Sequence, residues 1–238
     1  MTPNVKLSIV VPCYNEGRSI PLLLDRFTSA IRSLGDSVEL ILVENGSLDD
    51  SAGLLRDVLH AGKHPFARVV SVPRNEGYGF GVWRGLKAAR GDCVAITHAD
   101  LQCDPKDVVR AFAVFQRAGG DVLVKGARRH RALGEMVFTW GLAAFASMVL
   151  GCSMRDANAQ PKVFPRSLLR VMVAPPKDST FDVYVLYCAK RAGLKVMSIP
   201  VRFRKRMYGV SSWTSSVSSR IRHVRMFVVG VFRMRFSR

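Results

Sequence analysis

The amino-acid sequence predicts an α/β fold, organised as a mostly parallel twisted sheet with helices on both faces. Short and almost continuously apolar segments alternate with segments of helical periodicity through the first half of the chain. Strands that are covered on both faces have this composition, and their alternation with helices is typical of a doubly wound sheet. Polar residues follow several of the apolar segments directly, at the positions where ligands bind such sheets.

The first half is expected to contain five strands and four helices, without an internal repeat or a low-complexity linker. The strands are predicted at residues 6–12, 38–44, 67–72, 93–97 and 121–126, and the helices at residues 19–34, 50–61, 79–89 and 105–117. Pro105 opens the last of these helices, where its missing N–H is not needed, and Asp104 is expected to help start it.

The second half is expected to add two helices, a strand and a C-terminal extension. The helices are predicted at residues 135–150 and 181–192. In residues 199–206 apolar side chains alternate with arginines, as in a strand with one apolar and one cationic face. Residues 213–238 carry arginines on both sides of an apolar patch, and we predict that they form a basic amphipathic helical extension of a domain spanning residues 1–212.

Positive charge is concentrated in the second half of the chain. Residues 1–120 contain 14 basic and 13 acidic side chains, whereas residues 121–238 contain 22 basic and 5 acidic ones. This excess indicates an anionic partner: nucleic acid, an anionic membrane or a phosphorylated substrate. Nucleic acid is the least favoured of the three, because the aromatic residues are not interleaved with the arginines as in a base-stacking platform.

The cysteines and the apolar segments limit the class of protein. Five cysteines without a CxxC pair are expected to be buried thiols of a reducing compartment, rather than a disulfide framework or a zinc site. We expect no signal peptide at the N-terminus, and the longest apolar run, residues 136–150, is shorter than a membrane span. We therefore expect that the chain does not cross a membrane by itself.

Polar residues at four predicted strand ends form the candidate site. They are Tyr14-Asn15-Glu16, Glu44-Asn45, Arg74-Asn75-Glu76 and His98-Ala99-Asp100. Because the carboxyl ends of parallel strands meet at one edge of a sheet, we expect these groups to converge. If the segment after the fourth strand is extended, the polar side chains at 98, 100 and 102 share one face, as a metal and phosphate site would require.

The glycine-rich segment 77–85 is not a dinucleotide-binding fingerprint. Val82 stands where the third glycine of GxGxxG belongs, and the segment follows the third strand instead of the first. Its glycines are expected to let a helix begin close to a ligand or to another part of the backbone.

Six segments, taken in order, resemble the family 2 glycosyltransferases of the GT-A fold, and most of all their polyprenyl-phosphate branch, typified by dolichol-phosphate mannose synthase. They are SIVVPCYNEG, VELILVENGSLDDS, RNEGYGFGVWRGLKAARGD, HADLQCDP, VKGARR and RFRKRMYGVSSW, and the resemblance runs from Leu7 to Trp213. It implies an inverting transferase that uses Mg²⁺ or Mn²⁺ and a UDP- or GDP-sugar. The implied acceptor is a polyprenyl phosphate at the cytoplasmic face of the membrane.

The resemblance implies a role for each residue that matches a family motif. The residues implied in nucleotide binding are Pro12, Tyr14, Glu16, Val43, Glu44, Asn45, Asn75 and Gly77. Those implied at the metal and the donor diphosphate are His98, Ala99, Asp100 and Gln102, with His98, Asp100 and Gln102 as metal ligands. Arg128 would bind a phosphate, and Arg206 would clamp the diphosphate in a motif that also contains Ser212. Asp100 and Arg206 are the two residues to which we assign the catalytic role.

Three positions depart from the family pattern. His98 replaces the first Asp of Asp-x-Asp-x-Gln, and its imidazole could ligate Mn²⁺ or hydrogen-bond the ribose or the diphosphate. Asn45 replaces a base-contacting Asp, which leaves the nucleotide open. Ser212 replaces a Lys and so removes one positive charge from the expected clamp.

The chemistry of sugar transfer explains the expected residue types. Breaking a sugar–diphosphate bond leaves an anionic nucleotide, so catalysis requires fixed positive charge on the leaving group. A lipid phosphate is already anionic and needs little help from a base, whereas Asp182 would be available if the acceptor were a hydroxyl.

Two alternatives remain at this point: the same fold acting on a glycan or a small hydroxyl acceptor, and a basic nucleic-acid-binding protein. The leading hypothesis places the chain peripherally on the inner face of the membrane, in contact with anionic lipid and with a membrane subunit or a second copy as a further partner. It expects no nucleic acid.

Overall fold

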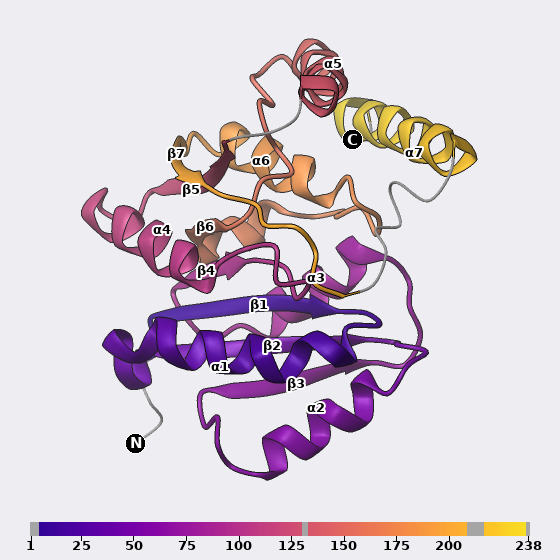
Figure 1. Ribbon diagram of the computed structural model, residues 1–238. Helices are drawn as coiled ribbons and strands as arrows, with labels where there is room; N and C mark the ends of the chain where they lie inside the picture. The colour runs from indigo at the N-terminus through magenta and orange to yellow at the C-terminus, as the bar shows by residue number, and fades with distance from the viewer. Residues whose placement is uncertain (1–4, 130–132, 209–216, 237–238) are drawn as a thin grey trace.

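The computed structural model describes residues 5–129, 133–208 and 217–236, and their central element is a seven-stranded sheet (Figure 1). The strands are β1 (Leu7–Cys13), β2 (Val38–Asn45), β3 (Ala67–Val72), β4 (Cys93–Ile96), β5 (Val122–Arg128), β6 (Lys162–Pro165) and β7 (Lys195–Val201), in the order β3-β2-β1-β4-β6-β5-β7. Only β6 is antiparallel to its neighbours. The predicted mostly parallel sheet is confirmed.

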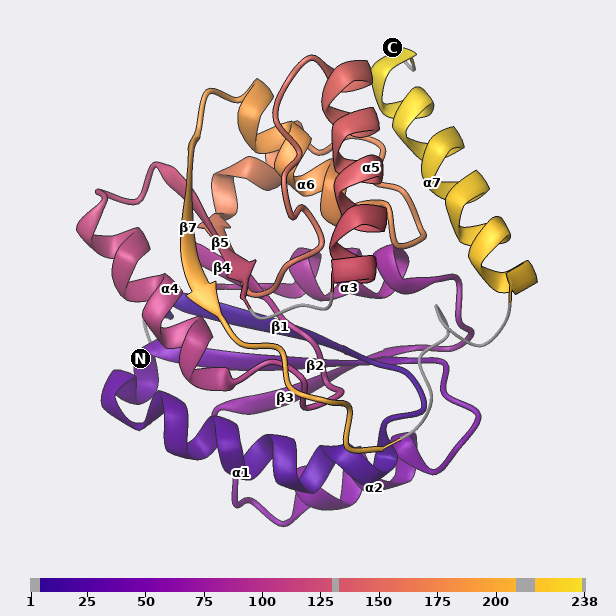
Figure 2. The same ribbon diagram turned by 45° about the horizontal axis from the view of Figure 1, so that its top comes forward.

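Helices cover both faces of this sheet. They are α1 (Ile20–Ile31), α2 (Ser51–His60), α3 (Tyr78–Ala88), α4 (Pro105–Arg117), α5 (Leu133–Leu150), α6 (Phe181–Arg191) and α7 (Val217–Phe236), with short 3-10 segments at 17–19, 32–37 and 166–171. Helices α1, α2 and α4 lie on one face, and α3 and α6 on the other, with α5 and α7 side by side beyond them (Figure 2). None of the described helices is long and apolar enough to cross a membrane.

Each face of the sheet has its own apolar core, and strand β1 shows why. Ile9 and Val11 point into the core beneath α1 and α4, whereas Val10 points into the core beneath α3 and α6. All three side chains are fully buried. Because successive side chains of a strand point to opposite faces, a strand covered on both sides is apolar at nearly every position.

The C-terminal helix that the sequence predicts is present as α7, and it packs on the second of these cores. Phe227 and Val231 are buried there, and Phe232 meets Phe145 of α5 edge to face with ring centroids 5.7 Å apart. A Cβ at Gly230 would lie 2.8 Å from Thr180 Cγ2, so a larger residue at this position would push α7 away from the start of α6.

Two sequence-based expectations about strands need correction. β6 was not predicted, because it has only four residues, begins with Lys162 and follows an irregular loop. The alternating pattern of residues 199–206 is strand only as far as Val201. Beyond it the chain leaves the sheet, and the Arg204 N–H donates to the Gln102 carbonyl at 3.0 Å instead of to a neighbouring strand.

The five cysteines are free thiols, as expected. Four of them are buried, and Cys152, just after α5, is half-buried. Burial raises the pKa of Cys13, and the charges of Glu16 and Glu44 add to this effect.

Candidate functional site

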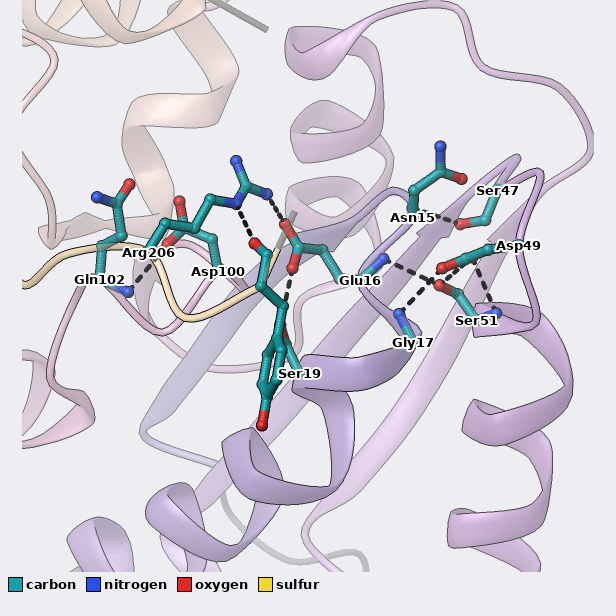
Figure 3. A network of polar contacts seen from close by, with 11 residues as sticks. Asn15, Glu16, Gly17, Ser19, Ser47, Asp49, Ser51, Asp100, Gln102 and Arg206 are labelled. Carbon is teal, nitrogen blue, oxygen red and sulfur yellow. Dashed lines mark hydrogen bonds and ion pairs between the residues drawn. The ribbon is translucent and has the colours of Figure 1, made fainter. Parts of the chain in front are cut away.

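Glu16 is the centre of a polar network at the carboxyl edge of the sheet (Figure 3). It follows β1, is 8% exposed and accepts a hydrogen bond from Ser19 Oγ at 2.9 Å. Its other carboxylate oxygen is paired with Arg206 Nη2. Burial raises the pKa of Glu16, the Arg206 charge opposes this, and the negative charge of Asp100 adds to it. Asp100 and Arg206 therefore both lie within electrostatic reach of Glu16, and the approach of Asp100 to Glu16 is the one that their strand ends predict.

The loops after β1 and β2 support Glu16 as one braced unit. The Glu16 N–H donates to Ser51 Oγ at 3.0 Å, and Ser51 Oγ donates to Asp49 Oδ1 at 2.5 Å. Asn15 accepts from the Leu48 N–H at 2.8 Å and has a φ of 54°, a left-handed conformation that Asn tolerates better than most residues. These bonds fix the backbone on which Glu16 is carried.

The segment after β4 turns sharply, so it is not the extended stretch assumed from its alternating pattern. Leu101 has a φ of 61°, which is strained for a bulky residue, and its fully buried side chain in the α1/α4 core holds it there. The Gln102 N–H donates to Asp100 Oδ1 at 3.1 Å. Asp104 caps α4 by accepting from the Lys106 N–H at 3.0 Å, which confirms its expected role.

Residues 202–208, here named the crossing segment, pass over this edge of the sheet. Gln102 Nε2 donates to the Arg204 carbonyl at 3.0 Å, and Arg204 Nη2 lies 3.2 Å from Asp104 Oδ2. Arg206 Nε donates to the Tyr208 carbonyl at 2.9 Å, while Nη2 reaches Glu16. The crossing segment thus brings a cation from the basic half of the chain to the acidic residues of the first half.

The side chain of His98 contacts helix α3. Its ring packs edge to face against Tyr78 of α3 with centroids 5.9 Å apart, and its Nε2 lies 3.5 Å from Tyr78 Oη. The described residues contain no group of three His, Cys, Asp or Glu side chains placed to hold a metal ion. The expected ligand set of His98, Asp100 and Gln102 stays a prediction.

Asp100 nevertheless suits a hard divalent cation. Mg²⁺ and Mn²⁺ prefer oxygen ligands, and in nucleotide-dependent enzymes one or two carboxylates and the substrate phosphates commonly suffice. Asp100 is half-buried, and a second carboxylate, that of Glu16, lies close enough to feel its charge. This donor set fits a cation that receives its remaining ligands from a bound diphosphate.

The other residues implied in nucleotide binding differ in how a ligand could use them. Tyr14 is 39% exposed and Pro12 is half-buried, whereas the side chains of Val43 and Ala99 lie in the cores. Glu44 Oε1 accepts from the Ser47 N–H at 2.7 Å and so braces the loop. Ser212 lies outside the described residues.

Asn45, Asn75 and Gly77 join the ends of β2 and β3 to the start of α3. Asn45 Nδ2 donates to the Gly77 carbonyl at 3.1 Å, and Asn75 Oδ1 accepts from the Gly77 N–H at 2.7 Å. Asn45 Oδ1 is buried without a partner among the described residues, so it is the atom here that a ligand donor could satisfy. A Cβ at Gly77 would lie 2.3 Å from the Lys177 carbonyl oxygen, so this glycine permits the close backbone approach expected from the sequence.

Sequence reasoning missed a buried polar cluster, formed by β5, the loop before β6, the first residue of β6 and the start of α6. Lys162 is fully buried, and its Nζ lies 2.6 Å from Asp182 Oδ1. Asp182 is therefore engaged in an ion pair and is not the available base that the sequence suggested. The sequence feature that could have indicated this cluster is the unusually polar segment RDANAQPK, which has no apolar periodicity and was therefore not assigned to a strand or a site.

Arg128 and Lys125 belong to the same cluster. Arg128 Nη2 lies 2.5 Å from Asp156 Oδ1, and its guanidinium stands over the Phe203 ring at 5.6 Å. Burial lowers the pKa of Lys125 to about 8. The negative charge of Asp156 opposes this shift, and the positive charges of neighbouring cations, above all Lys162, add to it. Positive charge is thus gathered at the end of β5, where the sequence predicts a phosphate-binding arginine.

A mostly parallel sheet with acidic and cationic residues at its carboxyl edge is consistent with a GT-A glycosyltransferase fold. The model of the family "Glycosyl transferase family 2" matches residues 8–164, and the chain belongs to this family.

Curated relatives and solved structures agree with this assignment. The undecaprenyl-phosphate 4-deoxy-4-formamido-L-arabinose transferase of Photorhabdus laumondii subsp. laumondii is 29% identical over 211 residues, covering 88% of this chain and 63% of the relative. The enzyme of the same name from Pseudomonas fluorescens is 32% identical, covering 87% and 60%. The chain thus spans about three-fifths of the length of these relatives.

Among solved structures, glucosyl-3-phosphoglycerate synthase from Mycobacterium tuberculosis with phosphoglyceric acid superposes with a TM-score of 0.74 at 23% identity, covering 97% of this chain and 80% of that one. The same enzyme with Mn²⁺, UDP-glucose and phosphoglyceric acid gives 0.70 at 25% identity, covering 97% and 79%. The likeness confirms the predicted fold.

Proposed function

We propose that this chain transfers a sugar from a nucleotide-sugar donor to a polyprenyl phosphate or a similar anionic lipid. Family membership supports the reaction type, and relatives named as undecaprenyl-phosphate transferases support the acceptor class. The observation that carries the proposal is the meeting of Glu16, Asp100 and Arg206 at the carboxyl edge (Figure 3).

The donor would bind through its diphosphate. Asp100 would hold a Mg²⁺ or Mn²⁺ ion, which neutralises charge on the diphosphate, and Gln102 lies beside it. Arg206 is paired with Glu16, and we expect its guanidinium to contact the diphosphate of a bound donor. Fixed positive charge on the departing nucleotide would favour direct displacement, which inverts the anomeric carbon.

The acceptor is best explained as a phosphate. A phosphate oxygen is already anionic, and Asp182, the base considered for a hydroxyl acceptor, is held by Lys162 and is 5% exposed. Arg128, oriented by Asp156, is our candidate for contacting the acceptor phosphate. A hydroxyl acceptor would require a general base, and Asp182 is not free to serve as one.

Helices α5 and α7 support a peripheral location at an anionic membrane surface. Large apolar side chains are exposed on both, with Trp140 at 55% and Met148 at 76% on α5, and Ile221 at 65% and Phe236 at 71% on α7. Helix α7 contains no acidic residue and five arginines: Arg220, Arg222, Arg225, Arg233 and Arg235. Each such arginine near an anionic leaflet contributes about 1 kcal/mol. We propose the cytoplasmic leaflet as this surface.

The first test is nucleotide binding. Thermal unfolding would be measured with UDP-, GDP- and other nucleotide sugars, each with and without Mn²⁺. We expect stabilisation that depends on Mn²⁺ for one nucleotide, its loss in Asp100→Asn, and its retention in Asp92→Asn, a control at an exposed aspartate outside the site.

The second test is transfer to polyprenyl phosphate in anionic liposomes by the protein that binds its donor. Transfer to phosphoglycerate or a glycan instead would contradict the lipid acceptor, and the absence of any metal-dependent nucleotide binding would contradict the enzyme. Salt-sensitive RNA binding without nucleotide binding would favour the nucleic-acid alternative.

A further inference from the structure

His98 stands where the family pattern has an aspartate, and its surroundings are different from those of a metal ligand. The Nε2 edge of its ring faces Tyr78 Oη at 3.5 Å, the outer limit of a hydrogen bond, and the two rings meet edge to face. The residue is half-buried, so part of it remains exposed.

The Tyr78 hydroxyl is in turn held by a hydrogen bond from a buried polar group. Gln160 Nε2 donates to Tyr78 Oη at 3.3 Å and to Asp182 Oδ1 at 2.9 Å. Lys162 Nζ donates to the same Asp182 oxygen at 2.6 Å. Gln160 and Lys162 are fully buried, whereas Tyr78 and His98 are both half-buried, so this chain of hydrogen bonds runs from the interior to these two partly exposed rings.

The Tyr78 hydroxyl remains protonated in this environment. Burial raises the pKa of Tyr78 well above its ordinary value, and the nearby Asp182 charge adds to the effect. A neutral phenol can donate one hydrogen bond and accept others, so it can complete the link between Gln160 and the imidazole.

Asp100 faces a different set of partners. It lies beside Arg206 in Figure 3, its charge acts on Glu16, and its Oδ1 accepts from the Gln102 N–H. The left-handed turn at Leu101 ends the alternation that would have placed the side chains of 98 and 102 on one extended face. The described residues also contain no group of three His, Cys, Asp or Glu side chains placed to hold a metal ion.

We propose that His98 works outside the metal shell, as a hydrogen-bonding group for a hydroxyl or phosphate oxygen of the sugar nucleotide, with Tyr78 as the residue that positions its ring. Nε2 faces Tyr78, so Nδ1 is the ring nitrogen assigned to the substrate. This inference rests on the proposed function for the identity of the ligand, while the positioning of His98 by Tyr78 does not.

Measurements of Mn²⁺ affinity distinguish a His98 that contacts the substrate from a His98 that ligates the metal. Mn²⁺ binding would be followed by electron paramagnetic resonance in the presence of UDP or GDP, whichever stabilises the protein. We expect His98→Ala to change the Kd for Mn²⁺ less than threefold, and Asp100→Asn to weaken it by roughly 100-fold or more. A loss of tenfold or more in His98→Ala would place the imidazole in the metal shell and overturn the proposal.

Nucleotide-sugar affinity tests the substrate contact. We expect His98→Ala to weaken donor binding about three- to tenfold, the loss of one neutral hydrogen bond, and His98→Asn to recover part of it. Unchanged donor affinity in His98→Ala would overturn the substrate contact.

Tyr78→Phe tests the positioning, because it removes the hydroxyl and keeps the ring that packs on His98. We expect the ¹⁵N resonances of the His98 ring to shift and donor affinity to fall, with the Kd for Mn²⁺ unchanged. Tyr187→Phe is the matched control: Tyr187 is another largely buried tyrosine, 5% exposed, whose hydroxyl contacts Arg191.

The two variants also separate this inference from the proposed function. Unchanged His98 resonances in Tyr78→Phe would contradict positioning even if the protein binds its donor. If no nucleotide binds to the unmodified chain, the proposed function fails, and the resonances still decide whether Tyr78 holds the imidazole.

Discussion

The buried ion pair of Lys162 and Asp182 gives a quantitative test of the packing beneath the site. Nζ and Oδ1 lie 2.6 Å apart, and the two side chains are 0% and 7% exposed. Lys162→Met keeps an unbranched apolar stem and removes the positive charge, whereas Asp182→Asn removes the negative charge with almost no change of shape. The pair can therefore be taken apart one charge at a time.

The structure indicates how much each change should cost. Removing one partner of a buried pair typically destabilises a protein by about 3–5 kcal/mol, because the remaining charge stays desolvated. In Lys162→Met the Asp182 carboxylate would retain one bond from Gln160 Nε2 at 2.9 Å. Such a bond to a charged group is worth about 1.5–3 kcal/mol, so we expect a loss near the lower limit, about 3 kcal/mol.

Asp182→Asn should behave differently with pH. Burial already lowers the pKa of Lys162, and without the Asp182 charge it falls further. The unfolded lysine binds its proton up to about pH 10.4. Stability therefore rises with pH once the folded pKa is passed, and the destabilisation by Asp182→Asn should become smaller as the pH is raised.

A double-mutant cycle in urea, followed by far-UV circular dichroism, measures the coupling. We expect Lys162→Met/Asp182→Asn to lose at least about 2 kcal/mol less than the sum of the single variants. The control is the exposed pair of Lys177 and Glu76, 63% and 38% exposed, for which coupling below about 1 kcal/mol is expected. Additivity within about 0.5 kcal/mol at the buried pair would refute the reasoning.

Three further outcomes are expected. Burial alone would raise the pKa of Glu39, but hydrogen bonds from Arg68, Ser8 and the Arg90 N–H lower it. The ionised Glu39 therefore stabilises the fold fully above the ordinary glutamate pKa of about 4.3, and this contribution is lost as the pH falls through the pKa of Glu39 in the folded protein. Glu39→Gln should accordingly make the free energy of unfolding, measured in urea, depend less on pH on the acid side. Lys125, whose pKa burial lowers to about 8, should make stability rise between about pH 8 and 10.4, and Lys125→Met should abolish that rise and be the more stable protein at pH 7. Gly79→Ala should lose about 1–3 kcal/mol, because its Cβ would lie 2.2 Å from the Pro176 carbonyl oxygen, whereas Gly141→Ala, with open space around its Cβ, should not destabilise α5; equal effects of the two substitutions would contradict the contact.

Most of the sheet could be predicted from the sequence because its strands are rich in apolar residues. β1, β2 and β3 need no other signal, and the cap at Asp104 with Pro105 defined the start of α4. β6 could not be found in this way, since an antiparallel strand of four residues that begins with a buried lysine has neither length nor periodicity.

The candidate site could be predicted as far as residue types at strand ends allow. The proximity of Glu16 and Asp100 follows from the parallel strands that precede them. The crossing segment could not be predicted, because its path depends on contacts with Gln102 and Asp104 that are distant in sequence. The environment of His98 also could not be predicted from the sequence, since its neighbour Tyr78 lies 20 residues earlier, at the start of α3.

The uneven burial of the cysteines offers a practical means of observing this protein at a lipid surface. Four thiols are shielded by burial, and Cys152, two residues beyond the end of α5, is the one among the five that is not buried. A fluorophore or nitroxide reagent should therefore attach preferentially to Cys152, beside the proposed lipid-facing helices, without any substitution in the chain. Labelling that slows in the presence of anionic vesicles would report contact between the membrane and this end of α5.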